Sequence, residues 1–63
     1  MKTTIKIERQ RKKITQKELA KEIGLTGIYV GMIERCQSYP SVLIALKIAK
    51  YFGLKVENFE EWN

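Results

Sequence analysis

The side chains that most often carry out acid–base or metal chemistry are nearly absent from this 63-residue chain. It has no histidine, which removes the commonest general base at neutral pH and the usual zinc ligand. Its one cysteine, Cys36, cannot form an intrachain disulfide or a cysteine-based metal cluster. We therefore expect no enzymatic activity, no metal site and no cofactor.

Length and hydropathy set further limits. We expect one small domain, residues 1–63, because a globule of this size buries only about 60% of its unfolded surface and has little room for a substrate cleft. With 44% apolar and 30% charged residues, the chain should fold rather than remain disordered. The longest apolar run, residues 42–46, is far too short to span a membrane, and the first six residues lack the apolar stretch of a signal peptide. These features predict a cytoplasmic protein with a reduced thiol.

The charges are unevenly distributed along the chain. Residues 1–21 carry a net charge of +6, residues 22–56 carry +2, and residues 57–63 carry −3. A basic N-terminal third on a domain with a pI near 9.6 favours a polyanionic partner, with nucleic acid ahead of an anionic membrane surface. The alternative is a solvated helix face that only keeps the protein in solution.

Turn and capping residues divide the chain into helical segments that would position these charges. We predict five helices, at about residues 4–12, 15–23, 27–35, 42–51 and 56–62. In the last of them Val56, Phe59 and Trp62 form an apolar stripe. No segment alternates as a β-strand does, although residues 2–7 could pair with the last residues as a small ribbon. The pattern predicts a compact all-α fold.

The second and third helices have the clearest boundaries. Thr15 and Glu18 form a capping box, in which each side chain satisfies a free backbone N–H group at the helix start. Gly24 suits the left-handed conformation that ends a helix, and Thr26 can cap the next one. A joint of only three residues, 24–26, forces a steep angle between the helices. This is the signature of a helix-turn-helix motif at about residues 15–35.

The chain resembles the Cro/repressor-type (XRE) helix-turn-helix family over about residues 5–60. The resemblance is carried by Ile14-Thr15-Gln16-Lys17-Glu18-Leu19-Ala20, Ile23-Gly24-Leu25-Thr26, Val30, Ile33-Glu34-Arg35, Pro40-Ser41 and Leu46-Lys47-Ile48-Ala49-Lys50. It implies a five-helix domain of the lambda-repressor-like type. Such domains bind double-stranded DNA, usually as homodimers, with the third helix in the major groove.

The resemblance also implies which residues contact DNA. Gln16, at the start of the second helix, would donate a hydrogen bond to a phosphate, strengthened by the helix dipole. The positions that would face the major groove are Thr26, Gly27, Ile28, Tyr29 and Met32. The positions that would lie near phosphates are Lys17, Gln37 and Ser38.

Two further features follow from the family pattern. Arg9 and Glu34 would form a largely buried ion pair between the first and third helices. Cys36 stands where the family favours Gly or Asn, and we predict a left-handed backbone conformation for it because the third helix must stop there.

A chain of this length cannot bury all of its larger apolar side chains. The fourth helix and the C-terminal segment carry the excess. We therefore predict a dimer interface formed by Leu43, Ile44, Phe59 and Trp62.

The groove-facing residues leave two functions open. Family members usually have Arg, Gln, Ser, Asn or Lys at several of these positions, whereas this chain has Gly27, Ile28 and Met32. The first hypothesis is a sequence-specific transcriptional regulator, and more specifically a repressor, that reads DNA by apolar contacts with thymine methyl groups and by DNA shape. The alternative is a helix-turn-helix scaffold that binds a protein partner, as an antitoxin or anti-regulator does.

Overall fold

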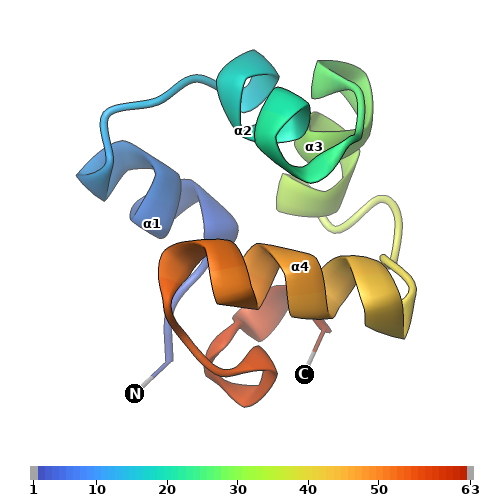
Figure 1. Ribbon diagram of the computed structural model, residues 1–63. Helices are drawn as coiled ribbons and strands as arrows, with labels where there is room; N and C mark the ends of the chain where they lie inside the picture. The colour runs from blue at the N-terminus through green and yellow to red at the C-terminus, as the bar shows by residue number, and fades with distance from the viewer. Residues whose placement is uncertain (1, 63) are drawn as a thin grey trace.

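The computed structural model describes residues 2–62, which form four α-helices and two short 3₁₀ helices (Figure 1). These are α1 (Ile5–Arg11), α2 (Gln16–Ile23), α3 (Gly27–Glu34), α4 (Val42–Phe52), η1 (Val56–Asn58) and η2 (Glu60–Trp62). None of the helices in this range has the length and apolarity needed to cross a lipid bilayer. The all-helical prediction is confirmed, but the number of α-helices is four rather than five.

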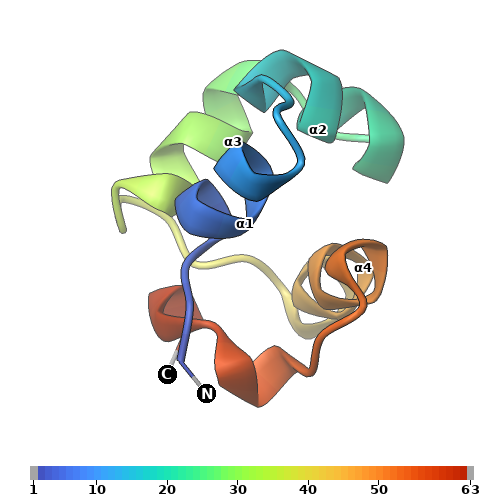
Figure 2. The same ribbon diagram turned by 90° about the vertical axis from the view of Figure 1, so that its left-hand side faces the viewer.

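The helices enclose one apolar core. In Figures 1 and 2, α2 and α3 lie together above α4, and α1 closes one side of the molecule. Each of these helices contributes side chains that are almost fully buried, and the C-terminal segment adds another. The buried core consists of Ile5, Leu19, Ala20, Ile23, Val30, Ile33, Ile48, Ala49 and Phe59.

Hydroxyl side chains define where the α-helices begin. The side chains of Thr4, Thr15, Thr26 and Ser41 each accept a hydrogen bond from the backbone N–H group three residues further on. Each such cap stabilises its helix by about 1 kcal/mol. The capping box predicted at Thr15 and Glu18 is present, with both reciprocal hydrogen bonds. Local sequence therefore decides the helix starts.

Left-handed residues end the helices. Gly24 and Gly53 cap α2 and α4 with φ angles of 75° and 70°. Cys36 has a φ angle of 58°, which confirms the left-handed conformation predicted for it. Lys13 has the same φ angle, and nothing in the sequence pattern indicated it. A residue with a Cβ atom is strained in this region, and the strain at Cys36 is of the order of 1 kcal/mol.

The predicted fifth α-helix is wrong. Phe59 separates η1 from η2 and has an extended backbone, with φ −93° and ψ 133°. This conformation lets Phe59 form an isolated parallel bridge with Thr3, in which the Thr3 N–H group donates to Asn58 O at 2.7 Å. It also places the Phe59 ring in the core. The small ribbon that we expected between the ends of the chain is thus reduced to a single bridge.

A second contact between the ends of the chain involves Glu61. Its Oε2 atom accepts a hydrogen bond of 2.7 Å from the Ile5 N–H group, at the first residue of α1. The Glu61 side chain is buried, and its Oε1 atom has no hydrogen-bond partner among residues 2–62. Burial raises the pKa of Glu61; the Ile5 N–H group lowers it, and the charges of Glu34 and Glu60 raise it further.

Replacement of Cys36 by glycine should stabilise the fold. Glycine has no Cβ atom to strain at positive φ, so Cys36→Gly should gain about 1 kcal/mol and raise Tm by roughly 4–8 °C in a domain of this size. Cys36→Ser, which retains the Cβ atom and removes the thiol, is the control and should melt near the parent. Thermal unfolding followed by circular dichroism measures both. A lower Tm for Cys36→Gly than for Cys36→Ser would contradict the strain.

The burial of Glu61 should make stability depend on pH. A carboxyl whose pKa is higher in the folded than in the unfolded state stabilises the fold at low pH, and this contribution is lost as pH rises through the folded pKa. As pH rises from about 4, the free energy of unfolding of the parent should therefore fall relative to that of Glu61→Gln, whose amide does not titrate. Urea denaturation of both proteins at several pH values measures this difference, and a constant offset between them would refute it.

Candidate nucleic-acid interface

The geometry of the helix-turn-helix motif depends on the joint between α2 and α3. Gly24 turns the chain in the left-handed conformation, and the Leu25 N–H group donates to Ala20 O at 2.8 Å. Thr26 then starts α3 at once. On the inner side Ala20, Val30 and Ile33 are buried, so α3 is fixed by the core along one face. Its opposite face is free to contact a partner.

The outer face of α3 is largely apolar. Thr26 and Ile28 are exposed, and the Ile28 side chain is 78% exposed. Met32 is half-buried, and Tyr29 is half-buried against the core cluster. The Thr26 hydroxyl oxygen is used as a cap for the Tyr29 N–H group, which leaves the hydroxyl hydrogen to donate. Thr26 and Ile28 are therefore the residues of this face that a partner reaches first.

The two glycines of α3 lie against neighbouring segments and do not simply face outward. A Cβ atom on Gly27 would lie 3.4 Å from Lys17 Cα, so this glycine borders the start of α2. Gly31, one turn further along α3, is buried. A Cβ atom there would meet the ends of the Gln16 and Arg35 side chains. The reason is that α2 begins beside α3 and covers this side of it.

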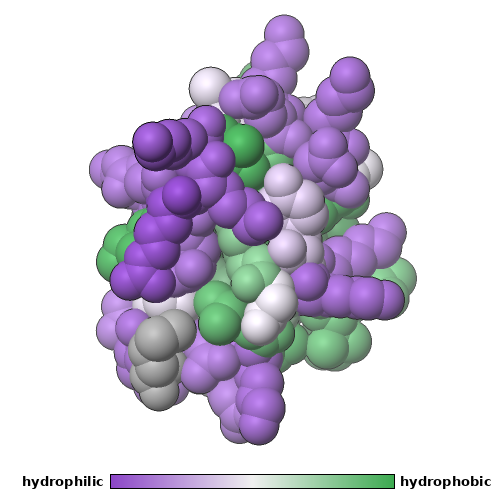
Figure 3. All heavy atoms as spheres, turned by 60° about the vertical axis from the view of Figure 1, so that its left-hand side comes forward, coloured by the Kyte–Doolittle hydropathy of each residue, from purple (hydrophilic) through white to green (hydrophobic). Residues whose placement is uncertain are grey.

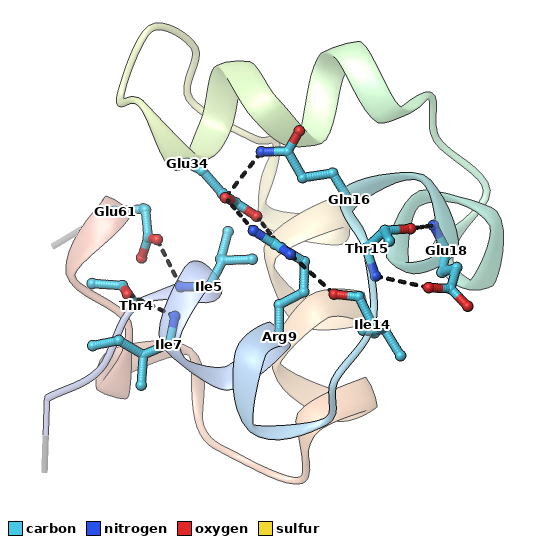
Figure 4. A network of polar contacts seen from close by, with 10 residues as sticks. All are labelled: Thr4, Ile5, Ile7, Arg9, Ile14, Thr15, Gln16, Glu18, Glu34 and Glu61. Carbon is cyan, nitrogen blue, oxygen red and sulfur yellow. Dashed lines mark hydrogen bonds and ion pairs between the residues drawn. The ribbon is translucent and has the colours of Figure 1, made fainter.

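A buried ion pair connects α1 with α3. Arg9 Nε donates to Glu34 Oε2 at 2.8 Å and Arg9 Nη2 to Glu34 Oε1 at 3.2 Å (Figure 4). The two side chains are only 13% and 4% exposed. Arg9 Nη1 also donates to Ile14 O at 3.0 Å, in the segment before α2. The ion pair implied by the family resemblance is thus present and holds three segments together.

Gln16 is joined to this ion pair. Its Nε2 atom donates to Glu34 Oε1 at 3.1 Å, as Figure 4 shows. Because a carboxylate only accepts hydrogen bonds, the amide nitrogen must face Glu34, and the amide oxygen points the other way. Gln16 is half-buried, whereas Lys17 beside it is exposed. The side chain proposed for phosphate contact therefore has a fixed orientation before any ligand binds.

Gln37 and Ser38 lie in the segment that directly follows α3. Gln37 is exposed, and its Oε1 atom accepts a hydrogen bond of 3.0 Å from Arg35 Nε. Ser38 is half-buried. Sequence reasoning did not single out Arg35 or Gly31 for any role. Their spacing of four residues could have indicated that they lie side by side, since residues i and i+4 are neighbours on a helix.

The residues predicted for a dimer interface fall into two groups. Leu43 is 66% exposed, and Ile44 and Trp62 are half-buried against the core cluster. Phe59 is fully buried, so its inclusion in an interface was wrong. The extended backbone at Phe59 turns its ring inward, where it stacks at 5.0 Å from the Trp62 ring. On α4 the exposed apolar side chains are Val42, Leu43 and Leu46.

The charge of the N-terminal third lies on the surface. Figure 3, which brings the side of α1 toward the viewer, shows hydrophilic side chains over most of that face. Every lysine from Lys2 to Lys21 is exposed. In the described part of the chain, no group of three or more Cys, Asp or Glu side chains is arranged to hold a metal ion. The chemistry available here is that of cationic and hydrogen-bond donor groups toward an anion.

Comparisons with known proteins identify the same motif. A model described as helix-turn-helix matches residues 5–59. Uncharacterized HTH-type transcriptional regulators of Methanocaldococcus jannaschii and Bacillus subtilis are each 40% identical over 58 residues. Both matches cover 92% of this chain and 88% of the relative. A third such regulator, from Archaeoglobus fulgidus, is 38% identical over 58 residues, which cover 92% of this chain and 82% of the relative.

Removal of the Glu34 charge should destabilise the protein strongly. Glu34→Gln leaves the nearly buried Arg9 guanidinium without its counter-charge, which typically costs about 3–5 kcal/mol. The control is Glu22→Gln, the same change at an exposed position of α2, with an expected cost within about 0.5 kcal/mol. Chemical denaturation gives both values. Equal stability of the two variants would show that the Arg9–Glu34 pair contributes little.

Proposed function

Because this chain belongs to the XRE-type helix-turn-helix family of transcriptional regulators, we propose that it is a homodimeric repressor that binds double-stranded DNA in a sequence-specific manner. The observation that supports this most is the placement of α3. One face of α3 is fixed to the core, and the other carries the exposed Thr26 and Ile28 beside the cationic start of α2. An α-helix presented in this way fits the major groove of B-DNA.

Affinity and discrimination would come from different residues. Lys17, the Gln16 amide and the exposed lysines of the N-terminal third supply contacts to phosphates, which carry no sequence information. Ile28 and Met32 would contact thymine methyl groups, and the Thr26 hydroxyl would donate to a base acceptor. No Arg, Lys, Asn or Gln lies within α3, so bidentate reading of guanine or adenine is not offered by this helix. DNA shape would add to the selection.

The exposed apolar surface of α4 supports the homodimer. Val42, Leu43 and Leu46 are 78%, 66% and 50% exposed, and they lie on neighbouring turns of the same helix. A contiguous apolar surface on a small protein marks an interaction site. In a symmetric dimer the same patch meets its copy, and two α3 helices enter successive major grooves. The half-sites would then lie about 34–36 Å apart.

Repression requires fewer binding surfaces on this small protein than activation does. A dimer that covers a promoter excludes the polymerase by its volume alone, whereas activation requires an additional surface that is matched to the polymerase. We therefore propose repression rather than activation.

One observation favours a second candidate function, that of a protein-interaction module. Ile28 is 78% exposed at the centre of the surface that would read DNA. An exposed isoleucine with Met32 one helical turn away could equally anchor a protein partner. In this case the helix-turn-helix would be a scaffold, as in an antitoxin or anti-regulator. The two functions differ in their dependence on DNA sequence.

The test compares two substitutions on a DNA site that is selected in vitro and on random duplex. Ile28→Ala should lower the ratio of selected to random affinity, because it removes an apolar contact to a base. The free-energy difference between the two complexes should fall by about 1–3 kcal/mol. Lys17→Ala should weaken both complexes alike and reduce the salt dependence by about one phosphate contact. Fluorescence anisotropy at one fixed salt concentration measures the ratios, and the selected site should contain two half-sites about 34–36 Å apart.

The outcomes separate the candidates. An unchanged ratio in Ile28→Ala means that α3 does not read bases. If the parent also shows no salt-dependent binding to duplex, while Ile28→Ala abolishes binding to a protein partner, the interaction-module function replaces the DNA-binding one.

A further inference from the structure

The ends of two polar side chains meet over Gly31. A Cβ atom at this position would lie 3.2 Å from Arg35 Nη1 and 3.3 Å from Gln16 Oε1. Both distances are tighter than most Cβ contacts, so an alanine side chain would require the end of Arg35 or of Gln16 to shift by a few tenths of an ångström. Gly31 lies in the interior of α3, where glycine costs about 0.5–1 kcal/mol relative to alanine. Glycine at this position therefore leaves the space open at a cost in helix propensity.

The Gln16 side chain is held in place from the other side. Its amide nitrogen donates to Glu34 Oε1, and Glu34 is itself held by Arg9. The amide oxygen and nitrogen would lie 3.3 and 3.6 Å from a Cβ atom on Gly31, so the amide borders the same space as Arg35 Nη1. The second N–H group of the amide has no partner among residues 2–62 and can donate to a ligand.

Arg35 reaches the same space from the end of α3. Its Nε atom donates a hydrogen bond of 3.0 Å to Gln37 Oε1. Its Nη1 and Nη2 atoms have no hydrogen-bond partner in the described part of the chain. Arg35 also forms no ion pair with the acidic residues of that part, and the nearby carboxylate of Glu34 is already neutralised by Arg9. The charge of Arg35 is therefore uncompensated, and the free edge of its guanidinium presents two parallel donors.

We propose that Arg35 and Gln16 form a clamp for one phosphate of the DNA backbone, and that Gly31 is the positioning residue that leaves room for it. A guanidinium edge binds two oxygens of a phosphodiester, and the free N–H group of the Gln16 amide donates to the same group. Arg35 supplies the charge, and Gln16 adds an amide donor whose position is fixed by Glu34. This inference rests on the proposed DNA-binding function and adds to it a phosphate contact made by Arg35.

The clamp explains why the two side chains have such different surroundings. Gln16 is half-buried and held by a buried ion pair, so it loses little conformational freedom when DNA binds. Arg35 is exposed and oriented only by Gln37 and by the space over Gly31. A change at either Gly31 or Gln37 should therefore act on binding through Arg35.

The central experiment measures the salt dependence of binding to random duplex DNA. Arg35→Gln should weaken binding about tenfold at about 0.1 M salt and should lower the slope of log K against log salt by about 0.9, which corresponds to one phosphate contact. The matched control is Lys47→Gln, which removes the same charge from an exposed position of α4. It should leave the slope within error of the parent value.

A second variant tests the positioning role of Gly31. Gly31→Ala should reduce the slope by less than Arg35→Gln does, because it shifts the side-chain ends and keeps the charge. In the Arg35→Gln background it should change binding less than twofold, since the clamp is already lost. Circular dichroism establishes that each variant is folded before its binding is measured. A purely structural role of Gly31 would lower Tm and leave the slope of folded Gly31→Ala unchanged, which overturns the positioning role.

The results also separate the clamp from the proposed function. If the parent binds duplex with a steep salt dependence and Arg35→Gln has the same slope as Lys47→Gln, the clamp is wrong and the DNA-binding function stands. If the parent does not bind duplex at low salt, the DNA-binding function itself is wrong and the clamp with it.

Discussion

The buried ion pair between Arg9 and Glu34 is the interaction on which the rest of the structure depends. It joins α1 to the last residue of α3, and through Ile14 O and the Gln16 amide it also fixes the segment before α2 and the first residue of that helix. An intact buried ion pair contributes little net stability, but removal of one partner is costly because it leaves the other charge buried and unpaired. Its main effect here is geometric, because it sets the position of α2 and α3 relative to α1.

This arrangement separates the groups that attract DNA from the groups that distinguish sequences. The cationic and amide groups lie at the start of α2 and at the end of α3, whereas the face of α3 between them carries Ile28 and Met32. Neutralisation of Arg9 by Glu34 leaves Arg35 and Lys17 as the cations near the α2–α3 contact that have no ion pair with the described residues. The proposed regulator would therefore bind DNA mainly through phosphates and would select sequences by methyl contacts and shape.

The C-terminal segment closes the fold in a way that its own sequence does not indicate. The spacing of Val56, Phe59 and Trp62 is compatible with a helix, and all three do pack toward the core. Phe59 nevertheless adopts an extended backbone, because it pairs with Thr3 at the other end of the chain. Glu61 is then carried to the start of α1, where a carboxylate is favourable for the free N–H groups but is poorly solvated.

The sequence by itself determined the helix starts, the glycine stops, the helix-turn-helix joint and the left-handed Cys36, because each depends on residues within one helical turn. The ion pair of Arg9 with Glu34 was accessible only through the family resemblance. Only the tertiary structure decided the extended Phe59, the buried Glu61 and the meeting of Gln16 and Arg35 over Gly31. Ile5 and Glu61, for example, are 56 positions apart, and no local preference encodes such a contact. Long-range packing overrides local propensity wherever it satisfies a buried group that the local structure leaves unpaired.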